Sequence, residues 1–199
     1  MQIDAVTKPL GVLAELRVGY PFRGAIEPVA RGAVAVVQMK DVAPSGVLDW
    51  SRVVRTELTG RKAPDWLQAG DVLLVARGSR FYAVVLDEIV KDAVCGPHLC
   101  HVRLKRNSTV LPRFLAWQIN QPPIQRLLRQ AAEGSSQLSI RRAELEALPI
   151  CVPPKAAQER IVRLADAARQ ERMLLEKLIE NRERMLGSLA IALAAPSQK

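Results

Sequence analysis

Four residues with metal-binding side chains lie close together in the stretch CGPHLCH, namely Cys95, His98, Cys100 and His101. Thiolates and imidazoles are the usual ligands of structural zinc. Zinc fingers separate their two ligand pairs by about a dozen residues, so that two elements can meet at the ion. Here neighbouring side chains of a strand would point to opposite faces. We therefore expect structural cysteines and histidines in a turn and a strand, and no metal.

Motifs for catalysis are incomplete. The stretch NQPPI (120–124) resembles the Asn-Pro-Pro-aromatic motif of DNA adenine methyltransferases, but a glutamine intervenes and Ile124 stands where an aromatic residue would stack on a flipped base. No glycine-rich cofactor loop follows a predicted strand. The chain has two histidines, and both lie in one turn, so few residues could form a catalytic acid–base pair. We expect no enzyme activity and no cofactor.

The chain is strongly basic, with 29 Lys and Arg residues against 20 Asp and Glu residues and a formal charge of +9. Such a surplus favours a polyanion such as nucleic acid, or an anionic membrane surface, although solubility alone is the alternative. The basic residues gather at 52–62, 103–113 and 126–142, where few acids accompany them. These clusters are candidates for contacts with phosphates.

The sequence also bears on location. The N-terminal stretch MQIDAVTKPLGVLAEL carries acids and lacks the long apolar core of a signal peptide. No run of about 18 apolar residues predicts a membrane span. Three cysteines, an odd number, fit reduced thiols. We expect a cytoplasmic protein.

The elements that must carry these side chains follow from the apolar pattern. Residues 32–42 predict a Val-rich strand, and residues 65–90 predict two strands joined at Gly78-Ser79. A turn and a strand follow at 93–105. Strands joined by a short Gly-containing loop indicate a mainly antiparallel, partly closed β domain.

Helical spacing takes over in the second half of the chain. Residues 111–132 predict two helices that Pro122-Pro123 separates, and a short helix is expected at 140–148. The fold class is therefore α+β. Pro153-Pro154 then starts a region without Pro or Gly until Gly187, which predicts one long C-terminal helix from about 154 to 193. The predicted domains are 1–152 and 153–199.

The long helix has a coiled-coil-like pattern. A helix of 40 residues would span about 60 Å, more than a domain of this size needs to cover its own core. Its apolar stripe is expected to pair with another helix, while a helix folded back on its own domain is the alternative. Glu171 and Arg182 interrupt the stripe. The predicted seam consists of Ile161, Leu164, Ala168, Leu175, Leu178, Met185 and Leu189.

The order of these elements resembles the specificity subunits of type I restriction–modification systems. AVVQMKDV (35–42) is similar to the strand that ends in a basic residue and Asp, and LQAGDVLLVARGS (67–79) to the Gly-Asp strand motif. Residues 102–162 are the most similar, with a helix pair, a polar loop and a Leu-Pro-Ile…Pro-Pro…Gln-x-x-Ile-Val signature. Family members usually have two recognition domains and two spacer helices. This chain has one of each and so resembles a half-subunit.

The resemblance implies a non-catalytic subunit that reads double-stranded DNA. It implies pairing of two copies through the long helix, and docking of DNA adenine methyltransferase subunits and of a restriction subunit. The polar loop after Gly134 is the part that the resemblance places near DNA. Loop positions and side-chain chemistry give the candidate DNA contacts Arg52, Arg55, Arg61, Lys62, Arg77, Ser79, Arg80, Tyr82, Lys105, Arg106, Asn107, Ser135, Ser136 and Gln137.

Two other functions remain open from the sequence. One is a scaffolding or interaction subunit of another phage-defence assembly, which would not read a DNA sequence. The other is a methyltransferase or nuclease that acts alone, for which we expect no activity. Steep salt dependence of duplex binding would distinguish a DNA reader from a scaffold.

Overall fold

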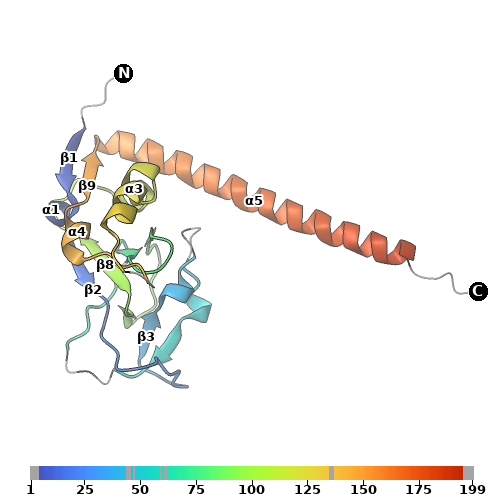
Figure 1. Cartoon of the computed structure of the whole chain (residues 1–199), viewed down its shortest axis with the longest axis horizontal. Helices are drawn as coiled ribbons and strands as arrows, with labels where there is room; N and C mark the ends of the chain where they lie inside the picture. The colour runs from blue at the N-terminus through green and yellow to red at the C-terminus, as the bar shows by residue number, and fades with distance from the viewer. Residues whose placement is uncertain are drawn as a thin grey trace, which may run out of the picture. The chain divides into compact units, whose positions relative to one another are not determined.

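The computed structural model describes residues 5–43, 46, 48–58, 60, 62–134 and 137–194 (Figure 1). Contacts divide the chain into two compact units, Met1–Arg160 and Ile161–Lys199. The first unit contains three sheets and the short helices, together with the first residues of the long helix α5 (Lys155–Ala194). The second unit is the rest of α5 and the C-terminal residues. The α+β class and the long C-terminal helix are thus confirmed.

A four-stranded antiparallel sheet lies at the centre of the first unit. Its order is β2-β8-β5-β6, and Val72 to Val75 of β5 pair with β6 on one side and with β8 on the other. Val and Leu fill β5, which is buried on both faces, as a central strand requires. The strands are β2 (Ala14–Val18), β5 (Val72–Val75), β6 (Tyr82–Val85) and β8 (Leu99–Leu104).

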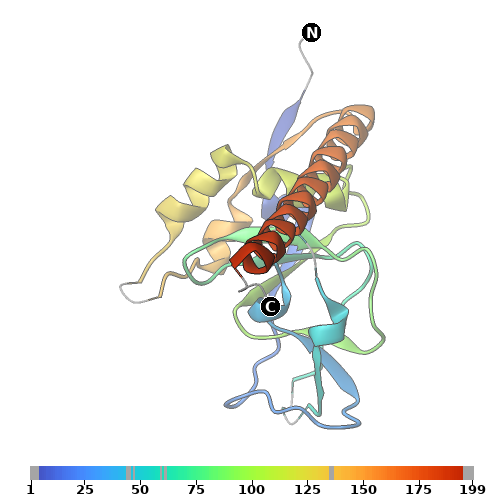
Figure 2. The same ribbon diagram turned by 90° about the vertical axis from the view of Figure 1, so that its right-hand side faces the viewer.

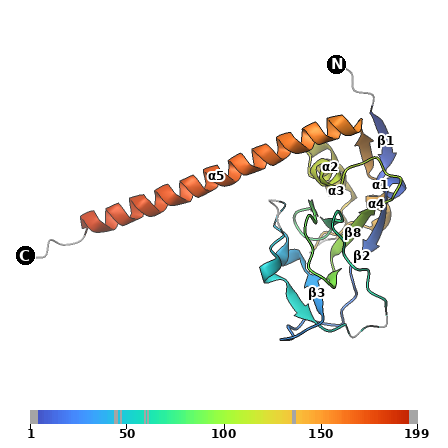
Figure 3. The same ribbon diagram turned by 180° about the vertical axis from the view of Figure 1, so that it is seen from behind.

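A second sheet of three strands has the order β4-β3-β7. Among the strands that the structure describes, β3 (Val34–Val37) and β7 (Ala93–Cys95) make the one parallel pair, whereas β4 (Val54–Thr56) is antiparallel to β3. This sheet lies at the opposite end of the first unit from helices α2 and α3 in all three views (Figures 1, 2 and 3). Within the described residues no sheet closes on itself, so the β region consists of open sheets.

The N-terminal residues form two strands that the sequence pattern did not predict. Strand β1 (Val6–Pro9) pairs with β9 (Pro149–Val152), which directly precedes the two prolines before α5. A single helical turn, α1 (Leu10–Leu13), connects β1 to β2. The burial pattern of β1 is exposed throughout, which removes the alternation that reveals a half-buried strand in a sequence.

One apolar core joins the two larger sheets. Buried side chains from β3, β5, β6, β7 and β8 pack together, among them Val37, Leu73, Val84 and Leu99. Helix α2 packs on β6 and buries Phe114, Leu115 and Ile119. Both α2 (Pro112–Ile119) and α3 (Pro122–Ala131) begin with proline, which fits the first turn because its missing N–H has no partner there. Helix α4 (Arg142–Glu146) follows.

Candidate nucleic-acid interface

Strand register brings two separate loops to one end of the central sheet. Val75 at the end of β5 lies opposite Leu99 at the start of β8, and Val18 at the end of β2 lies opposite Cys100. The β5–β6 connection (76–81) and the β7–β8 turn (96–98) are therefore neighbours. Residues at the other ends of the same strands, such as 103–107, lie at the opposite end of the sheet.

Backbone hydrogen bonds fix these loops to one another. Gly78 N donates to Leu138 O at 2.9 Å and Ile140 N donates to Ala76 O at 3.0 Å, so the segment before α4 runs along the β5–β6 connection. Gly78 has a φ of +104°, a conformation that glycine adopts without the steric cost of a side chain. Gly96 N donates to Val37 O at 2.8 Å and ties the β7–β8 turn to β3.

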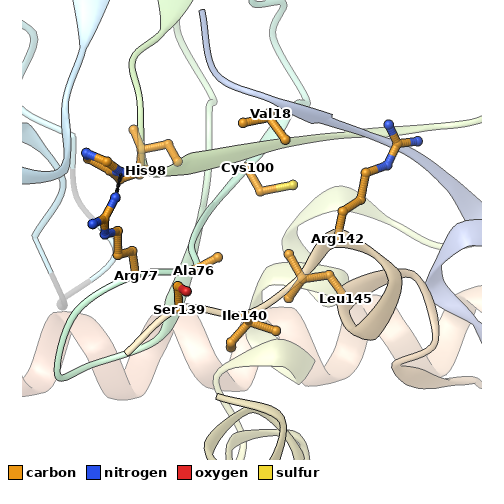
Figure 4. A pocket seen from close by; sticks show the side chains of 10 residues that line it. Val18, Ala76, Arg77, His98, Cys100, Ser139, Ile140, Arg142 and Leu145 are labelled. Atoms are coloured by element: carbon orange, nitrogen blue, oxygen red, sulfur yellow. Dashed lines mark hydrogen bonds between the residues drawn. The ribbon is translucent and has the colours of Figure 1, made fainter. Parts of the chain in front are cut away.

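The β5–β6 connection, the β7–β8 turn and residues 138–140 come together at this end of the sheet, which we call the junction. The side chains of Arg77 and His98 meet there. Arg77 Nη1 lies 2.7 Å from His98 Nδ1, and the two side chains face each other in Figure 4. Burial and the neighbouring Arg77 lower the pKa of His98 below its usual value of 6.5, so the imidazole is neutral at pH 7 and accepts the hydrogen bond. His98 has a φ of +72°, in the left-handed region.

Arg77 and His98 also line a cavity of about 190 Å³. Its wall contains apolar side chains such as Val18, Leu99 and Ile140, while Arg77 and Arg142 come from opposite sides (Figure 4). The Nε atom of Arg77 is buried and has no hydrogen-bond partner among the described residues. The junction thus combines an apolar floor with cationic edges.

Some predicted DNA contacts gather at this end of the sheet. Arg77, Ser79 and Arg80 belong to the β5–β6 connection, and Gln137 adjoins Leu138, which bonds to Gly78. Ser79, Arg80 and Gln137 are exposed. Tyr82 is half-buried and its hydroxyl donates to Val42 O at 2.7 Å, so this side chain holds a neighbouring loop. Burial raises the pKa of Tyr82.

The candidates of the first basic cluster lie elsewhere. Arg52 is exposed on η2 (Trp50–Arg52). Arg55, on β4, donates to Gly32 O and Ala33 O at 2.8 and 2.6 Å, and so holds the backbone that enters β3. Lys62 lies 3.4 Å from the carboxylate of Asp65. Two of these three cations therefore have intramolecular partners.

The remaining candidates follow β8 or lie outside the described residues. Lys105, Arg106 and Asn107 are at the opposite end of the central sheet from Arg77, because β8 runs away from the junction. Lys105 Nζ donates to Gly11 O at 2.8 Å, whereas Arg106 and Asn107 are exposed. Arg61, Ser135 and Ser136 lie outside the described residues. The full set of candidates does not form one surface patch.

Ion pairs distinguish the arginines around the junction. Arg141 pairs with Glu133 at 2.6 Å and Arg142 pairs with Glu146 at 2.7 Å. Arg77 bonds to a neutral imidazole, and Arg80 is exposed with no ion pair among the described residues. Charges that are already paired attract a phosphate less strongly, so Arg77 and Arg80 are the strongest cations for a polyanion here.

The Gly-Asp motif has a structural role. Asp71 is buried and accepts two hydrogen bonds from Arg103 at 2.8 and 2.7 Å and one from Gln68 N at 2.6 Å, while His101 Nε2 lies 2.8 Å from its carboxylate. Burial opposes ionisation, but the bonds from Arg103 and His101 outweigh it and lower the pKa of Asp71 to about 2. Asp71 thus joins β5 to β8.

The cysteines and histidines of CGPHLCH differ in their burial. Cys95, Cys100 and His101 are buried, whereas His98 is exposed at the junction. Burial raises the pKa of Cys95, and it raises the pKa of Cys100 to about 11, so both thiols stay protonated at pH 7. In the described part of the chain no cluster of three or more His, Cys, Asp or Glu residues could hold a metal ion.

Sequence reasoning missed the roles of two residues, His98 at the junction and Gln158 at the start of α5. The sequence pattern predicts a structural turn at His98, and only strand register places this residue beside Arg77. Gln158 is completely buried and accepts from Leu111 N at 2.8 Å, while its amide donates to Thr109 O and Pro153 O at 3.0 and 2.8 Å. These bonds anchor the first turn of α5. In the sequence, the place of Gln158 at the start of the Gln-x-x-Ile-Val signature was the feature that could have indicated this role.

The predicted seam residues all lie on α5. Taken on the helix itself, Leu164, Leu175, Leu178, Met185 and Leu189 are between 50 and 71 % exposed. Complete burial of one such side chain contributes about 1.5–3 kcal/mol. A stripe of this kind is a candidate contact for another helix. In the described part of the chain, none of the helices has the combination of length and apolar composition that a membrane-spanning segment needs.

No family model matches the chain, and no curated protein matches it. Solved structures do. The S subunit of the type I restriction–modification system from M. genitalium matches 92 % of this chain with a TM-score of 0.60 and 19 % identity. The HsdS subunit from Thermoanaerobacter tengcongensis matches 87 % with a TM-score of 0.62 and 17 % identity.

A third match is a chain from a structure on complex assembly and conformational transition of the type I restriction–modification system, with 95 % of this chain covered, a TM-score of 0.66 and 18 % identity. This chain spans less than half the length of each match. The share is 43 % of the M. genitalium chain, 39 % of the Thermoanaerobacter chain and 44 % of the third chain. The resemblance that the motifs indicated is confirmed at the level of the fold, and its extent fits one recognition domain with one helix.

Proposed function

We propose that this chain is a non-catalytic DNA-recognition subunit of a type I-like restriction–modification system. The observation that carries this proposal is the extent of the structural match. The first unit contains 160 of the 199 residues, so a match over 92 % of the chain must extend into α5. The likeness therefore includes the recognition unit and part of the helix together, which is the combination that a half-subunit needs.

In this function the exposed cations of the β5–β6 connection contact the duplex. Arg80 is exposed and free of an ion pair within the described residues, so it can bind a phosphate or a base edge. Helix α5 pairs with the helix of a second copy and offers a docking surface for methyltransferase subunits. Two reading units at a fixed separation would then recognise a split, two-fold symmetric site. We place this activity in the cytoplasm.

Binding of the full chain to a random duplex at several salt concentrations tests the proposal. Each phosphate that the protein neutralises steepens the dependence of log K on log salt by about 0.9. We expect a slope of about −3 or steeper, because several basic residues contact phosphates together. A scaffold without DNA reading would bind weakly and with no steep slope, and that result would exclude the proposed function.

Arg80→Ala identifies the contact surface in a titration with a duplex that the chain selects from randomised sequences. Removing a contact of this residue with a base should weaken binding to a selected duplex by about 1–3 kcal/mol. Lys91→Ala is the matched control, because Lys91 is an exposed cation before β7, at the end of the sheets away from the junction. Equal binding by Arg80→Ala and the unaltered chain would remove Arg80 from the interface.

A further inference from the structure

We propose that Arg77 and His98 form one DNA-reading unit, in which His98 is a positioning residue that orients the Arg77 guanidinium toward the major-groove edge of a guanine. This inference rests on the proposed function and assigns a specific base contact within it. It gives a role to His98, the exposed member of the CGPHLCH stretch.

Arg77 is held in place without losing its charge. An arginine that an Asp or Glu orients is largely neutralised by its partner, as in the pairs of Arg141 with Glu133 and Arg142 with Glu146. Arg77 is oriented by the imidazole of His98, with Nη1 and Nδ1 2.7 Å apart. A neutral acceptor fixes the direction of the guanidinium and leaves its full positive charge for another ligand.

The backbone at both residues is also fixed. Arg77 pairs with Ser139 in an isolated β-bridge, and the hydrogen bonds of Ala76 with Ile140 and of Gly78 with Leu138 flank it. His98 lies two residues after Gly96, whose N–H bonds to Val37 O. Side chains on such anchored backbone keep their donors within the narrow range of geometry that base reading requires.

The unused donors of Arg77 match guanine. One N–H of Nη1 bonds to His98, and Nε is buried without a partner in the described structure. The second N–H of Nη1 and the N–H groups of Nη2 have no protein partner among the described residues. Two adjacent N–H groups are the arrangement that binds O6 and N7 of guanine bidentately. A phosphate contact needs charge alone and gains little from this fixed orientation.

Replacements of His98 separate its hydrogen bond from its backbone conformation. Asparagine places an oxygen acceptor near the position of Nδ1 and tolerates the positive φ, whereas glycine tolerates the φ and has no acceptor. His98→Asn and His98→Gly are therefore a matched pair. Arg77→Lys keeps a charge and removes the fork of donors. Thermal unfolding midpoints close to that of the unaltered chain establish that each variant is folded.

The experiment is selection of sequences by the full chain from duplexes with a randomised central segment, followed by competition against the same duplex with one guanine changed to adenine. We expect the unaltered chain and His98→Asn to prefer guanine at one position by about 5- to 150-fold. In His98→Gly the preference for guanine should fall to a ratio of about two or less. In Arg77→Lys the preference should also fall, because a lysine can still contact guanine but lacks the fixed pair of donors. The affinity for random duplex should change little in both variants.

The results that contradict the proposal differ from those that contradict the proposed function. Full guanine preference in His98→Gly would exclude a positioning role for His98. Unchanged guanine preference in Arg77→Lys, which keeps the charge, would make Arg77 a contact that needs charge alone, such as a phosphate contact. Salt-dependent binding of the unaltered chain with no preferred guanine would overturn the base contact alone. Absence of salt-dependent duplex binding would overturn the proposed function as well.

Discussion

At the scale of single residues, polar side chains join distant strands in this protein. Asn120 at the end of α2 accepts from Ala83 N and donates to Ala83 O, both at 2.8 Å, and so satisfies the free edge of β6. This asparagine belongs to the stretch that resembles a methyltransferase motif, yet its side chain is occupied by the sheet. Asp71 has a comparable role inside the sheet, where it holds Arg103. Both residues position the elements that end at the junction.

Replacement of Asp71 by Asn should destabilise the fold. Removing one partner of a buried ion pair leaves Arg103 uncompensated and costs about 3–5 kcal/mol of unfolding free energy at pH 7. Asp87→Asn is the control, since Asp87 pairs with Arg113 in the exposed setting where such pairs contribute at most about 1 kcal/mol. Urea titrations measure both, and equal small losses would contradict a bracing role for Asp71.

The same carboxyl group predicts a pH dependence. The pKa of Asp71 is about 2 in the folded chain against 3.8 for an unperturbed Asp, so its ionisation stabilises the folded state above about pH 4. This contribution should be lost as the pH falls from about 4 to 2. The difference in unfolding free energy between the unaltered chain and Asp71→Asn should therefore become smaller over that pH range. A difference that does not change with pH would show that ionisation of Asp71 is not its cause.

At the scale of elements, the start of α5 depends on one buried side chain. Gln158 bonds to the loop before α2 and to Pro153, so the first turn of the helix is part of the first unit. The two prolines before α5 cannot supply N–H groups to a preceding strand, and they separate β9 from the helix. The helix therefore begins at a fixed place on the first unit.

Gln158→Ala should weaken this attachment. The substitution leaves the Leu111 N–H and the carbonyls of Thr109 and Pro153 without their partner, and unsatisfied buried groups cost about 1–3 kcal/mol. Gln170→Ala, at an exposed position of the same helix, should change stability by less than about 0.5 kcal/mol. Chemical denaturation compares the two, and an equal effect would show that Gln158 adds nothing specific.

At the scale of the whole molecule, the proposed function requires a second copy. In that function a single recognition unit reads one half-site. Helix α5 carries exposed leucines along its predicted seam, among them Leu175 and Leu178. Contact with water is unfavourable for these side chains, so pairing of two helices would stabilise the assembly. Glu171 and Arg182 within the stripe are suited to set the register of such a pair.

Leu178→Asp and Leu175→Asp should each convert a dimer of the purified chain to a monomer of 21.9 kDa. A charge in an apolar seam must be desolvated without a partner, which opposes association. Lys177→Asp changes the charge on another face of the helix and should leave the mass unchanged. Analytical ultracentrifugation measures all three, and a monomer that is insensitive to both leucine substitutions would contradict pairing through α5.

The sequence alone determined the features that depend on neighbouring residues. Proline positions separated α2 from α3 and located the start of α5, and Val-rich runs with Gly78 between them predicted β5 and β6, because helix and strand periods are local properties. The tertiary structure decided which loops meet. Register placed His98 beside Arg77 and put residues 105–107 at the opposite end of the sheet. Such pairings depend on long-range strand contacts, which the pattern of one segment does not contain.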